Sequence, residues 1–228
     1  MKNYLLLSLA LALPAVAEDK PMLAIPGKVI YENALAAMPE GWTAPKGKWE
    51  AAEGGLRGAE LPADNHGAVV RFAKPLQDFI IQYEVKLDGA KGSSLSINDP
   101  KGHLARVSMT PASVAVTKDD HDHEGPDKAV VFGRLQADLK PGEWHTVRME
   151  MVGTQLLGRV DAVVAFGANE QLGVAKSNVG LTVAGQSAIF RNFKIWEATA
   201  NPDWDAVKAT LPKGTPLAPP KAVRTVRP

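Results

Sequence analysis

Two segments near the C-terminal end, in which apolar and polar residues alternate, strongly constrain the fold. The first follows a Pro141-Gly142 turn and runs from Trp144 to Val152, and the second runs from Ile189 to Glu197. In the first segment every second side chain is apolar, namely Val147, Met149 and Met151. A period of two is typical of β-strands that bury one face and expose the other. We therefore expect a fold built of antiparallel strands.

The same rhythm recurs along most of the chain. Between Val29 and Glu197 we predict about eleven short strands, separated by turns rich in Gly, Pro, Asn and Asp. The expected strands are 28–33, 48–52, 55–59, 67–73, 78–87, 93–98, 103–110, 113–118, 144–152, 155–166 and 179–196, the last as a closing pair. No convincing amphipathic helix interrupts them. The predicted fold class is all-β, a two-sheet antiparallel jelly-roll sandwich with a short C-terminal helix.

The segment from Asp78 to Asp88 shows the clearest alternation. Its odd positions are Phe79, Ile81, Tyr83, Val85 and Leu87, which we expect in the core. Its even positions include Gln82 and Glu84, which would point outward. In a sandwich the outer face of one sheet can form a shallow concave surface, so we expect the binding site on this even face.

The two ends of the chain carry signals of their own. In residues 1–17, Lys2 precedes an apolar run and Ala15-Val16-Ala17 fits the small-x-small cleavage pattern, which predicts a signal peptide. The product would be an exported protein, periplasmic or extracellular. The apolar run is shorter than the ~20 residues of a membrane span, so no membrane insertion is expected. We predict one domain, residues 18–198, followed by residues 199–228, a helix capped by Asn201 and a poorly ordered tail rich in Pro and basic residues from 212 onward.

Charge limits the classes of partner that the chain could bind, and the cysteine content limits how the fold can be stabilised. The chain has 26 basic and 25 acidic side chains, and removal of Lys2 with the leader would leave equal numbers. A balanced charge argues against a nucleic-acid surface, which needs an excess of Lys and Arg, and favours a neutral partner such as a glycan. The chain has no cysteine, so stability must come from the core without disulfides.

A polar stretch holds the densest set of potential metal ligands. These are Asp119, Asp120, His121, Asp122, His123 and Glu124. Carboxylate oxygens suit Ca²⁺, and two imidazoles would suit Zn²⁺. The spacing matches neither a calcium loop nor a structural zinc site. Three interpretations stay open: a solvated loop, a divalent metal site, or a direct contact with substrate.

Arginines and one tryptophan are candidate sugar contacts. Arg71, Arg106, Arg148 and Arg159 are expected on outward strand faces, where they could bind sugar hydroxyls or pair with nearby carboxylates. Trp42 lies in a Pro-rich, loop-like segment where its ring could stack on a sugar at the rim of the site. We predict that substrate is bound by Gln82, Arg106, Arg148, Arg159 and Trp42.

Several motifs together resemble those of a known family. They are Gly41-Trp42, Gly47-Lys48-Trp49, the Gly54–Gly58 hairpin, Glu143-Trp144-His145 and Phe190-Arg191-Asn192. This set resembles the 3-keto-disaccharide hydrolases, secreted bacterial domains of the concanavalin A-like lectin and glucanase superfamily. The match covers most of the chain and rests mainly on scaffold positions. Ala90–Ser94 and Asn98–His103 differ from the family's Gly-Asn-Ser-Gly turn and Glu-Tyr-Gln segment, so the chain is identified as a divergent member.

The resemblance implies hydrolysis of a 3-keto-glycoside. Glu84 would serve as acid or base, and its partner would be Asp99, His103 or a metal held by residues 119–124. Related glucanases place alternating acids on one strand, whereas Glu84-Val85-Lys86-Leu87-Asp88 has a lysine at the central position. This departure argues against their two-carboxylate mechanism.

Three functions therefore remain compatible with the sequence. The leading hypothesis is an exported, non-catalytic carbohydrate-binding sandwich that recognises a glycan on its concave face. The second is a glycoside hydrolase acting on 3-keto-glycosides. The third is a structural or protein-interaction sandwich of the cell envelope.

Overall fold

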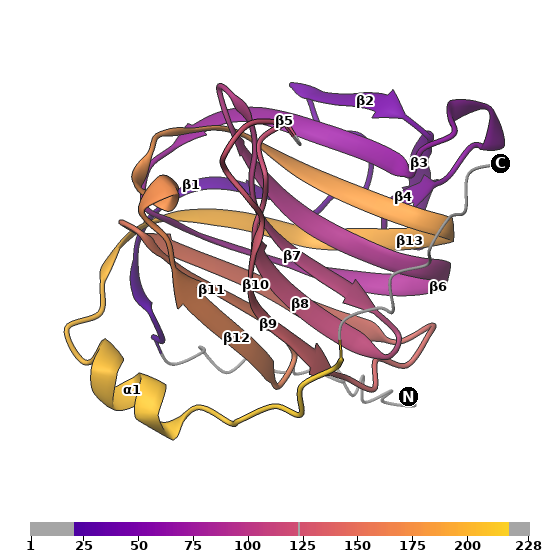
Figure 1. Cartoon of the computed structure of the whole chain (residues 1–228). Helices are drawn as coiled ribbons and strands as arrows, with labels where there is room; N and C mark the ends of the chain where they lie inside the picture. The colour runs from indigo at the N-terminus through magenta and orange to yellow at the C-terminus, as the bar shows by residue number, and fades with distance from the viewer. Residues whose placement is uncertain (1–20, 123, 219–228) are drawn as a thin grey trace, which may run out of the picture.

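The computed structural model describes residues 21–122 and 124–218, and strands dominate this part of the chain (Figure 1). The predicted leader, residues 1–17, lies outside it. The strands are β1 (Ala24–Asn33), β2 (Trp42–Lys46), β3 (Lys48–Ala52), β4 (Gly55–Ala59), β5 (Ala68–Leu76), β6 (Phe79–Asp99), β7 (Gly102–Thr110), β8 (Ser113–Lys118), β9 (Val130–Gln136), β10 (Trp144–Val152), β11 (Gln155–Val160), β12 (Val163–Ala168) and β13 (Lys176–Ala200). The helical elements are η1 (Pro62–Asp64), η2 (Glu170–Gly173) and α1 (Trp204–Thr210).

Two long strands, β6 and β13, hold the sandwich together because each runs through both of its layers. Residues 79–89 of β6 pair with 187–197 of β13 and with β10, which gives a first sheet in the order β12-β11-β10-β6-β13, flanked by β4, β3 and β1. Residues 92–98 of β6 pair with 178–184 of β13 and with β7, which gives a second sheet in the order β9-β8-β7-β6-β13-β5-β2. All pairings are antiparallel. The all-β, two-sheet antiparallel sandwich is confirmed.

Glycines let the two long strands turn from one sheet into the other. The register between β6 and β13 shifts around Gly185, opposite residues 89–92. Gly185 has a φ of 91°, and a Cβ there would lie 2.8 Å from the backbone nitrogen of Lys91. A left-handed backbone at such close approach favours glycine. The sequence prediction ended a strand at residue 87 and began another at 93, because a Gly-rich stretch also marks turns.

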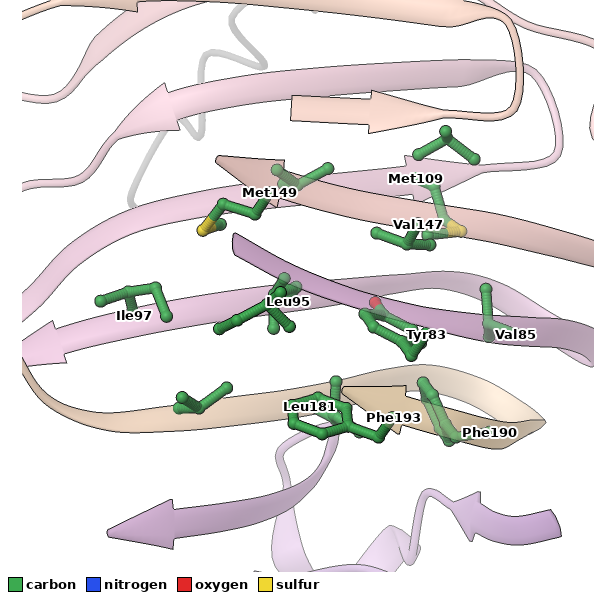
Figure 2. Close-up of a cluster of buried hydrophobic side chains, with 14 of the residues drawn as sticks. Tyr83, Val85, Leu95, Ile97, Met109, Val147, Met149, Leu181, Phe190 and Phe193 are labelled. Carbon is green, nitrogen blue, oxygen red and sulfur yellow. The ribbon is translucent and has the colours of Figure 1, made fainter. Parts of the chain in front are cut away.

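The core lies between the two sheets. The odd positions of β6 that were predicted to be buried, from Phe79 to Leu87, are fully buried. They meet apolar side chains of both sheets in one cluster, and Figure 2 shows Tyr83 and Val85 among Leu95, Leu181 and Phe193. The alternation in the sequence therefore identified the core face correctly.

Tyr83 brings a hydroxyl into this core. Its side chain is fully buried, burial raises the pKa of the hydroxyl above its usual range, and no described residue hydrogen-bonds to the oxygen. An unsatisfied buried hydroxyl destabilises the folded state by about 1–3 kcal/mol. We expect Tyr83→Phe to raise the free energy of unfolding by about 1 kcal/mol in chemical denaturation.

Tyr31→Phe is the matched control for that substitution. The hydroxyl of Tyr31 accepts a 2.8 Å hydrogen bond from Trp42 Nε1, so its removal should lower stability. Equal or lower stability of Tyr83→Phe relative to the wild-type protein would contradict the assignment of an unsatisfied hydroxyl.

Several strands and part of the tail differ from the sequence prediction. Residues 155–166, predicted as one strand, form β11 and β12, and the closing pair predicted over 179–196 is the single strand β13. β2 and β9 were not predicted: Pro45 interrupts the alternation of β2, and Gly133 interrupts that of β9. Proline is tolerated in β2 because this strand lies at the edge of the second sheet. Residues 215–217, expected in a poorly ordered tail, pair with the edge of β9 through hydrogen bonds from Gln136 N to Thr215 O and from Leu217 N to Arg134 O. The tail prediction is wrong there, and residues 219–228 lie outside the described part.

The predicted C-terminal helix is present as α1. Trp204 is buried against Leu23, Leu157 and Val164, and its Nε1 donates a 3.0 Å hydrogen bond to Gln155. The N-cap is Asp203 and not Asn201, so the predicted cap is corrected; Asn201 lies two residues earlier, where its side chain accepts a hydrogen bond from Asp203 N. The helix thus covers the edge of the first sheet near β11 and β12 (Figure 1). Among the described residues, no helix has the length and apolar character that a membrane crossing requires.

Candidate functional site

The predicted sugar-binding residues are divided between two opposite faces of the sandwich. Gln82, Glu84, Arg148 and Arg159 lie on the outer side of the first sheet, on β6, β10 and β11. Arg106 and His103 lie on β7, in the second sheet. The single concave surface that the sequence suggested is therefore two surfaces. Each of them contains a pocket, and we name these the first-sheet pocket and the second-sheet pocket.

Glu84 is engaged by its neighbours on the first sheet. Its Oε2 forms an ion pair with Arg191 Nε and accepts a 2.9 Å hydrogen bond from Asn192 Nδ2. Both partners contact the same carboxylate oxygen. A general acid must be able to reach the glycosidic oxygen, so an oxygen already engaged by two neighbours argues against the acid role that the family resemblance implied for Glu84.

Arg148 serves the structure and is not available to a sugar. It is 5% exposed, and its Nε donates to Glu150 Oε1 at 2.6 Å while its Nη1 donates to Gln82 at 3.0 Å. The pairing of an arginine with a nearby carboxylate, one of the two predicted alternatives, is thus confirmed for Arg148, and its prediction as a sugar contact is corrected.

Trp42 is also corrected, because it is not a platform at a rim. Its side chain is 7% exposed, its ring is stacked on Phe72 with centroids 5.4 Å apart, and its Nε1 is bound to Tyr31. The sequence placed it in a loop because of the flanking prolines, whereas it opens β2 and joins the core.

The second-sheet pocket brings together residues from three separate predictions. It has a volume of about 410 Å³. Its lining is polar and includes His103, Arg106, Asp119 and Asp120, which the sequence proposed for catalysis, sugar binding and metal binding. The rest of the lining is His66, Val69, Arg71, Ser96, Asn98, Ala129 and Thr182.

Small residues create the hollow of this pocket. Arg106 lies opposite Ser96, Ser96 opposite Gly180, and Gly180 opposite Arg71, so two arginines on β7 and β5 flank a floor made by β6 and β13. A Cβ on Gly180 would lie 2.6 Å from Ser96 Oγ. With strands about 4.8 Å apart, the two arginine backbones are roughly 14 Å apart, which leaves room for a sugar ring between their side chains.

His103 is held in one tautomer at the end of this floor. Its Nδ1 lies 3.2 Å from Asn98 Oδ1, and Asn98 Nδ2 donates to Asn178 Oδ1 at 3.1 Å. Because the amide nitrogen of Asn98 is the donor to Asn178, its oxygen is an acceptor and His103 Nδ1 carries the hydrogen. In the neutral ring the lone pair then lies on Nε2, as a general base requires.

The two arginines of the pocket differ in their surroundings. Arg106 Nη2 lies 3.1 Å from Asp119 Oδ2, and Asp119 Oδ1 accepts a 2.7 Å hydrogen bond from Thr117. Arg71 is exposed, and no residue in 21–122 or 124–218 forms a hydrogen bond or ion pair with its guanidinium group. Arg71 is therefore available to a ligand, while Arg106 is held in position by a carboxylate.

Asp99 stabilises the loop behind the pocket and does not line it. Its side chain is buried and accepts hydrogen bonds from the backbone nitrogens of Lys101 and Gly102, at 2.7 and 3.0 Å. Its other oxygen lies 3.1 Å from His121 Nε2. The prediction of Asp99 as a catalytic residue is corrected, because its contacts fix the turn at residues 99–102 and hold His121, and it does not line the pocket.

The acidic loop after β8 is tied to the sheet. Asp127 Oδ2 accepts from buried Lys118 and from His121 N, and the hydrogen bond from His121 N contributes most to lowering the pKa of Asp127. Carboxylate oxygens of Asp120, Asp122 and Asp127 lie within 4.8 Å of one another and could hold a cation. The predicted ligands Asp119 and His121 have the partners given above, Glu124 is exposed, and His123 lies outside the described residues.

Sequence reasoning missed His66 and Thr182 as pocket residues. His66 lies just before β5, and Thr182 lies on β13, more than a hundred residues later. Their meeting depends on the pairing of β5 with β13, which no local pattern reveals. The only available signal for His66 was an imidazole next to a glycine in a polar loop.

The first-sheet pocket is larger, at about 760 Å³. Its lining comes from β1, β6, β10, β11 and β13 and the segments beside them. The residues are Glu32, Asn33, Ala34, Gln82, Tyr83, Glu84, Thr146, Arg159, Asp161, Asn192, Lys194 and Trp196. Trp196 belongs to this lining, whereas no tryptophan lines the second-sheet pocket.

Comparison with known proteins supports this picture of the fold. Residues 36–196 match the family model described as a 3-keto-alpha-glucoside-1,2-lyase-like domain. None of the curated proteins with which the sequence was compared matches it.

Three solved structures with a similar fold are distant in sequence. The carbohydrate-binding module CBM66 from Bacillus subtilis is 16% identical with a TM-score of 0.57, covering 69% of this chain and 96% of its own. The non-specific endo-β-1,3(4)-glucanase SCLam from family GH16 is 10% identical with a TM-score of 0.56, covering 79% and 96%. An endo-β-galactosidase from Clostridium perfringens that releases GlcNAcα1-4Gal is 10% identical with a TM-score of 0.58, covering 78% and 65%. At such identities the likeness concerns the fold alone.

Proposed function

This chain belongs to the family of 3-keto-α-glucoside-1,2-lyase-like domains, and on that premise we propose that it cleaves a 3-keto-α-glucoside by elimination in the second-sheet pocket. The observation that carries the proposal is the floor of Ser96 and Gly180 between Arg71 and Arg106, with the oriented imidazole of His103 at its end. These groups supply a base and positive charge around a space of the size of a sugar.

The chemistry follows from the ketone. A carbonyl at C3 acidifies the hydrogen on C2, and His103 Nε2 takes that proton while the electrons of the C2–H bond move onto the C3 oxygen. Arg71 and Arg106 stabilise the negative charge of the resulting enolate. When the electrons return, a C1=C2 double bond forms and the C1–O bond breaks. The departing alcohol oxygen takes its proton from the imidazolium, so the reaction balances without an oxidant or a reductant.

Hydrolysis, which the sequence resemblance implied, receives less support from the pocket. Inverting and retaining glycosidases need two carboxyl groups across the scissile bond, one of them protonated. In the second-sheet pocket Asp119 is held by Thr117 and Arg106, and on the other sheet Glu84 is ion-paired with Arg191. A histidine base with cationic neighbours fits proton abstraction better than protonation of a glycosidic oxygen.

Mass spectrometry of products tests the proposal. We expect the protein to convert the 3-keto derivative of trehalose into glucose and an unsaturated ketosugar that is lighter by one water than 3-keto-glucose. Trehalose itself lacks the acidic C2 hydrogen and serves as the control that should not react. In water labelled with ¹⁸O, a labelled 3-keto-glucose would contradict elimination and support hydrolysis, and recovery of unchanged substrate would contradict both reactions.

A further inference from the structure

We propose that the first-sheet pocket is a second saccharide site, which binds a neutral oligosaccharide without converting it. This pocket lies on the face opposite the proposed active site, and the inference does not depend on the chemistry proposed there. With about 760 Å³ it has room for more than one sugar ring. Its lining combines an aromatic ring with many hydrogen-bonding groups, the composition that suits a polyhydroxylated ligand.

Trp196 supplies the apolar wall of the pocket. It lies on β13 directly opposite Ile80, where one part of its indole packs on Ala24, Ile80 and Val152 and another part remains accessible. Lys194 lies two residues away, with its Nζ 5.1 Å from the centre of the Trp196 ring. An indole with a neighbouring ammonium group offers a sugar both C–H contacts and a hydrogen-bond donor.

A β-bulge turns polar groups into the same pocket. β13 advances three residues from Arg191 to Lys194 while β6 changes by two, from Glu84 to Gln82. The extra residue is Asn192, whose φ of 55° is rarely adopted by residues other than glycine and whose backbone nitrogen donates to Ala34 O. Bulges of this kind redirect side chains and are frequent beside binding sites.

Left-handed backbone is concentrated around this pocket. Five described residues other than glycine have a positive φ, and two of them, Asp161 and Asn192, line the pocket while a third, Leu35, follows lining residue Ala34. For leucine such a conformation is strained, and strain of this kind persists where the surroundings impose it and gathers at functional sites. The fold therefore holds the rim of the pocket in a costly but defined shape.

The carboxylates of the pocket have partners within the lining or beside it, which points to a neutral ligand. Lys194 Nζ lies 3.3 Å from Glu32, Arg191 pairs with Glu84, and Asp161 Oδ2 lies 2.7 Å from His145. The lining carries three carboxylates, on Glu32, Glu84 and Asp161, and two cations, on Arg159 and Lys194. A site for an anionic sugar would need an excess of positive charge, which this lining lacks. Ion pairs of this kind can donate and accept hydrogen bonds with hydroxyl groups.

Calorimetric titration of the full chain tests this inference. The probes are cellohexaose, laminarihexaose and maltohexaose, with hexagalacturonate as the anionic comparison. We expect at least one neutral hexasaccharide to bind without being shortened. Thr146→Arg places a long side chain in the floor between Glu84 and Asp161 without removing any core contact, and it should weaken binding about tenfold, which corresponds to 1.4 kcal/mol.

Trp196→Ala should weaken binding to a similar extent, and circular dichroism will show whether this variant is folded. His103→Gln, on the opposite face, is the control and should leave binding of the hexasaccharide within twofold while it lowers kcat for the ketosugar by about 10²–10⁴-fold. The inference is overturned if no neutral hexasaccharide binds, if hexagalacturonate binds more tightly, or if Thr146→Arg binds as the wild-type protein does. Loss of binding in His103→Gln would also overturn it, because the ligand would then lie in the second-sheet pocket.

Discussion

Replacing His103 with glutamine should reduce kcat for a 3-keto-α-glucoside by about 10²–10⁴-fold, the usual contribution of a positioned general base. Glutamine can keep the hydrogen bond to Asn98 Oδ1, so the pocket should keep its shape and KM should change little. The expected loss in kcat with a nearly constant KM follows because the base acts only as the proton moves. Steady-state kinetics on the 3-keto derivative of trehalose gives both constants.

His66→Gln is the matched variant for this prediction. His66 lines the same pocket, but it is exposed and its Nδ1 lies 2.8 Å from the carbonyl oxygen of Gly67, outside the network that orients His103. We expect it to retain kcat within about fivefold, a change that corresponds to less than 1 kcal/mol. If His66→Gln loses turnover while His103→Gln retains it, the base has been assigned to the wrong imidazole.

Replacing Glu150 with alanine should lower the free energy of unfolding by about 3–5 kcal/mol, the cost of leaving a buried charge without its partner. The Glu150 side chain is fully buried, and it accepts hydrogen bonds from Arg148 Nε at 2.6 Å and from the backbone nitrogen of Ala24 at 2.8 Å. The second contact fastens the start of β1 to the first sheet. Its loss would add to the penalty of the unpaired guanidinium group.

Two comparisons make this second prediction specific. The double variant Arg148→Met with Glu150→Leu removes both charges, and it should recover most of the stability that Glu150→Ala loses. Asp138→Asn removes one partner of the exposed pair between Asp138 and Lys140, and it should change stability by less than about 1 kcal/mol. Urea denaturation monitored by tryptophan fluorescence measures all three variants. A loss below 1 kcal/mol in Glu150→Ala would contradict the importance of the buried pair.

Alternation in the sequence was sufficient to predict which side chains enter the core. Tyr83 and Val85 were expected inside because apolar residues occupy every second position of their strand, and both are fully buried. This signal is local, since it depends only on the period of two along one strand. The all-β class followed from the same alternation, whereas the short helix was predicted from local residues at its start.

Local patterns do not show which sheet a strand belongs to, and this is why one predicted surface became two. Gln82 and Arg106 both alternate outward, but β6 turns at residues 89–92 from the first sheet into the second. Beyond residue 92, a side chain of β6 that points outward therefore lies on the opposite face of the molecule. The sequence prediction placed both residues on one concave face because the corner resembled an ordinary turn between separate strands.

The residues that meet in the second-sheet pocket could not be predicted for a related reason. Arg71 was expected on an outward face, yet its position opposite Arg106 depends on two intervening strands, β13 and β6, that are far apart in the sequence. Trp42 gave the opposite error, because flanking prolines suggested a loop while tertiary packing buried the ring on Phe72. Both outcomes depend on non-local contacts that composition and spacing do not encode.

The most direct test of the account is a crystal structure of His103→Gln soaked with the 3-keto derivative of trehalose. We predict that the ketosugar lies on the floor of Ser96 and Gly180, with its C3 oxygen near Arg71 or Arg106 and its C2 facing residue 103. Electron density for the ketosugar only in the first-sheet pocket, or a bound sugar whose C2 faces away from residue 103, would contradict the proposed active site.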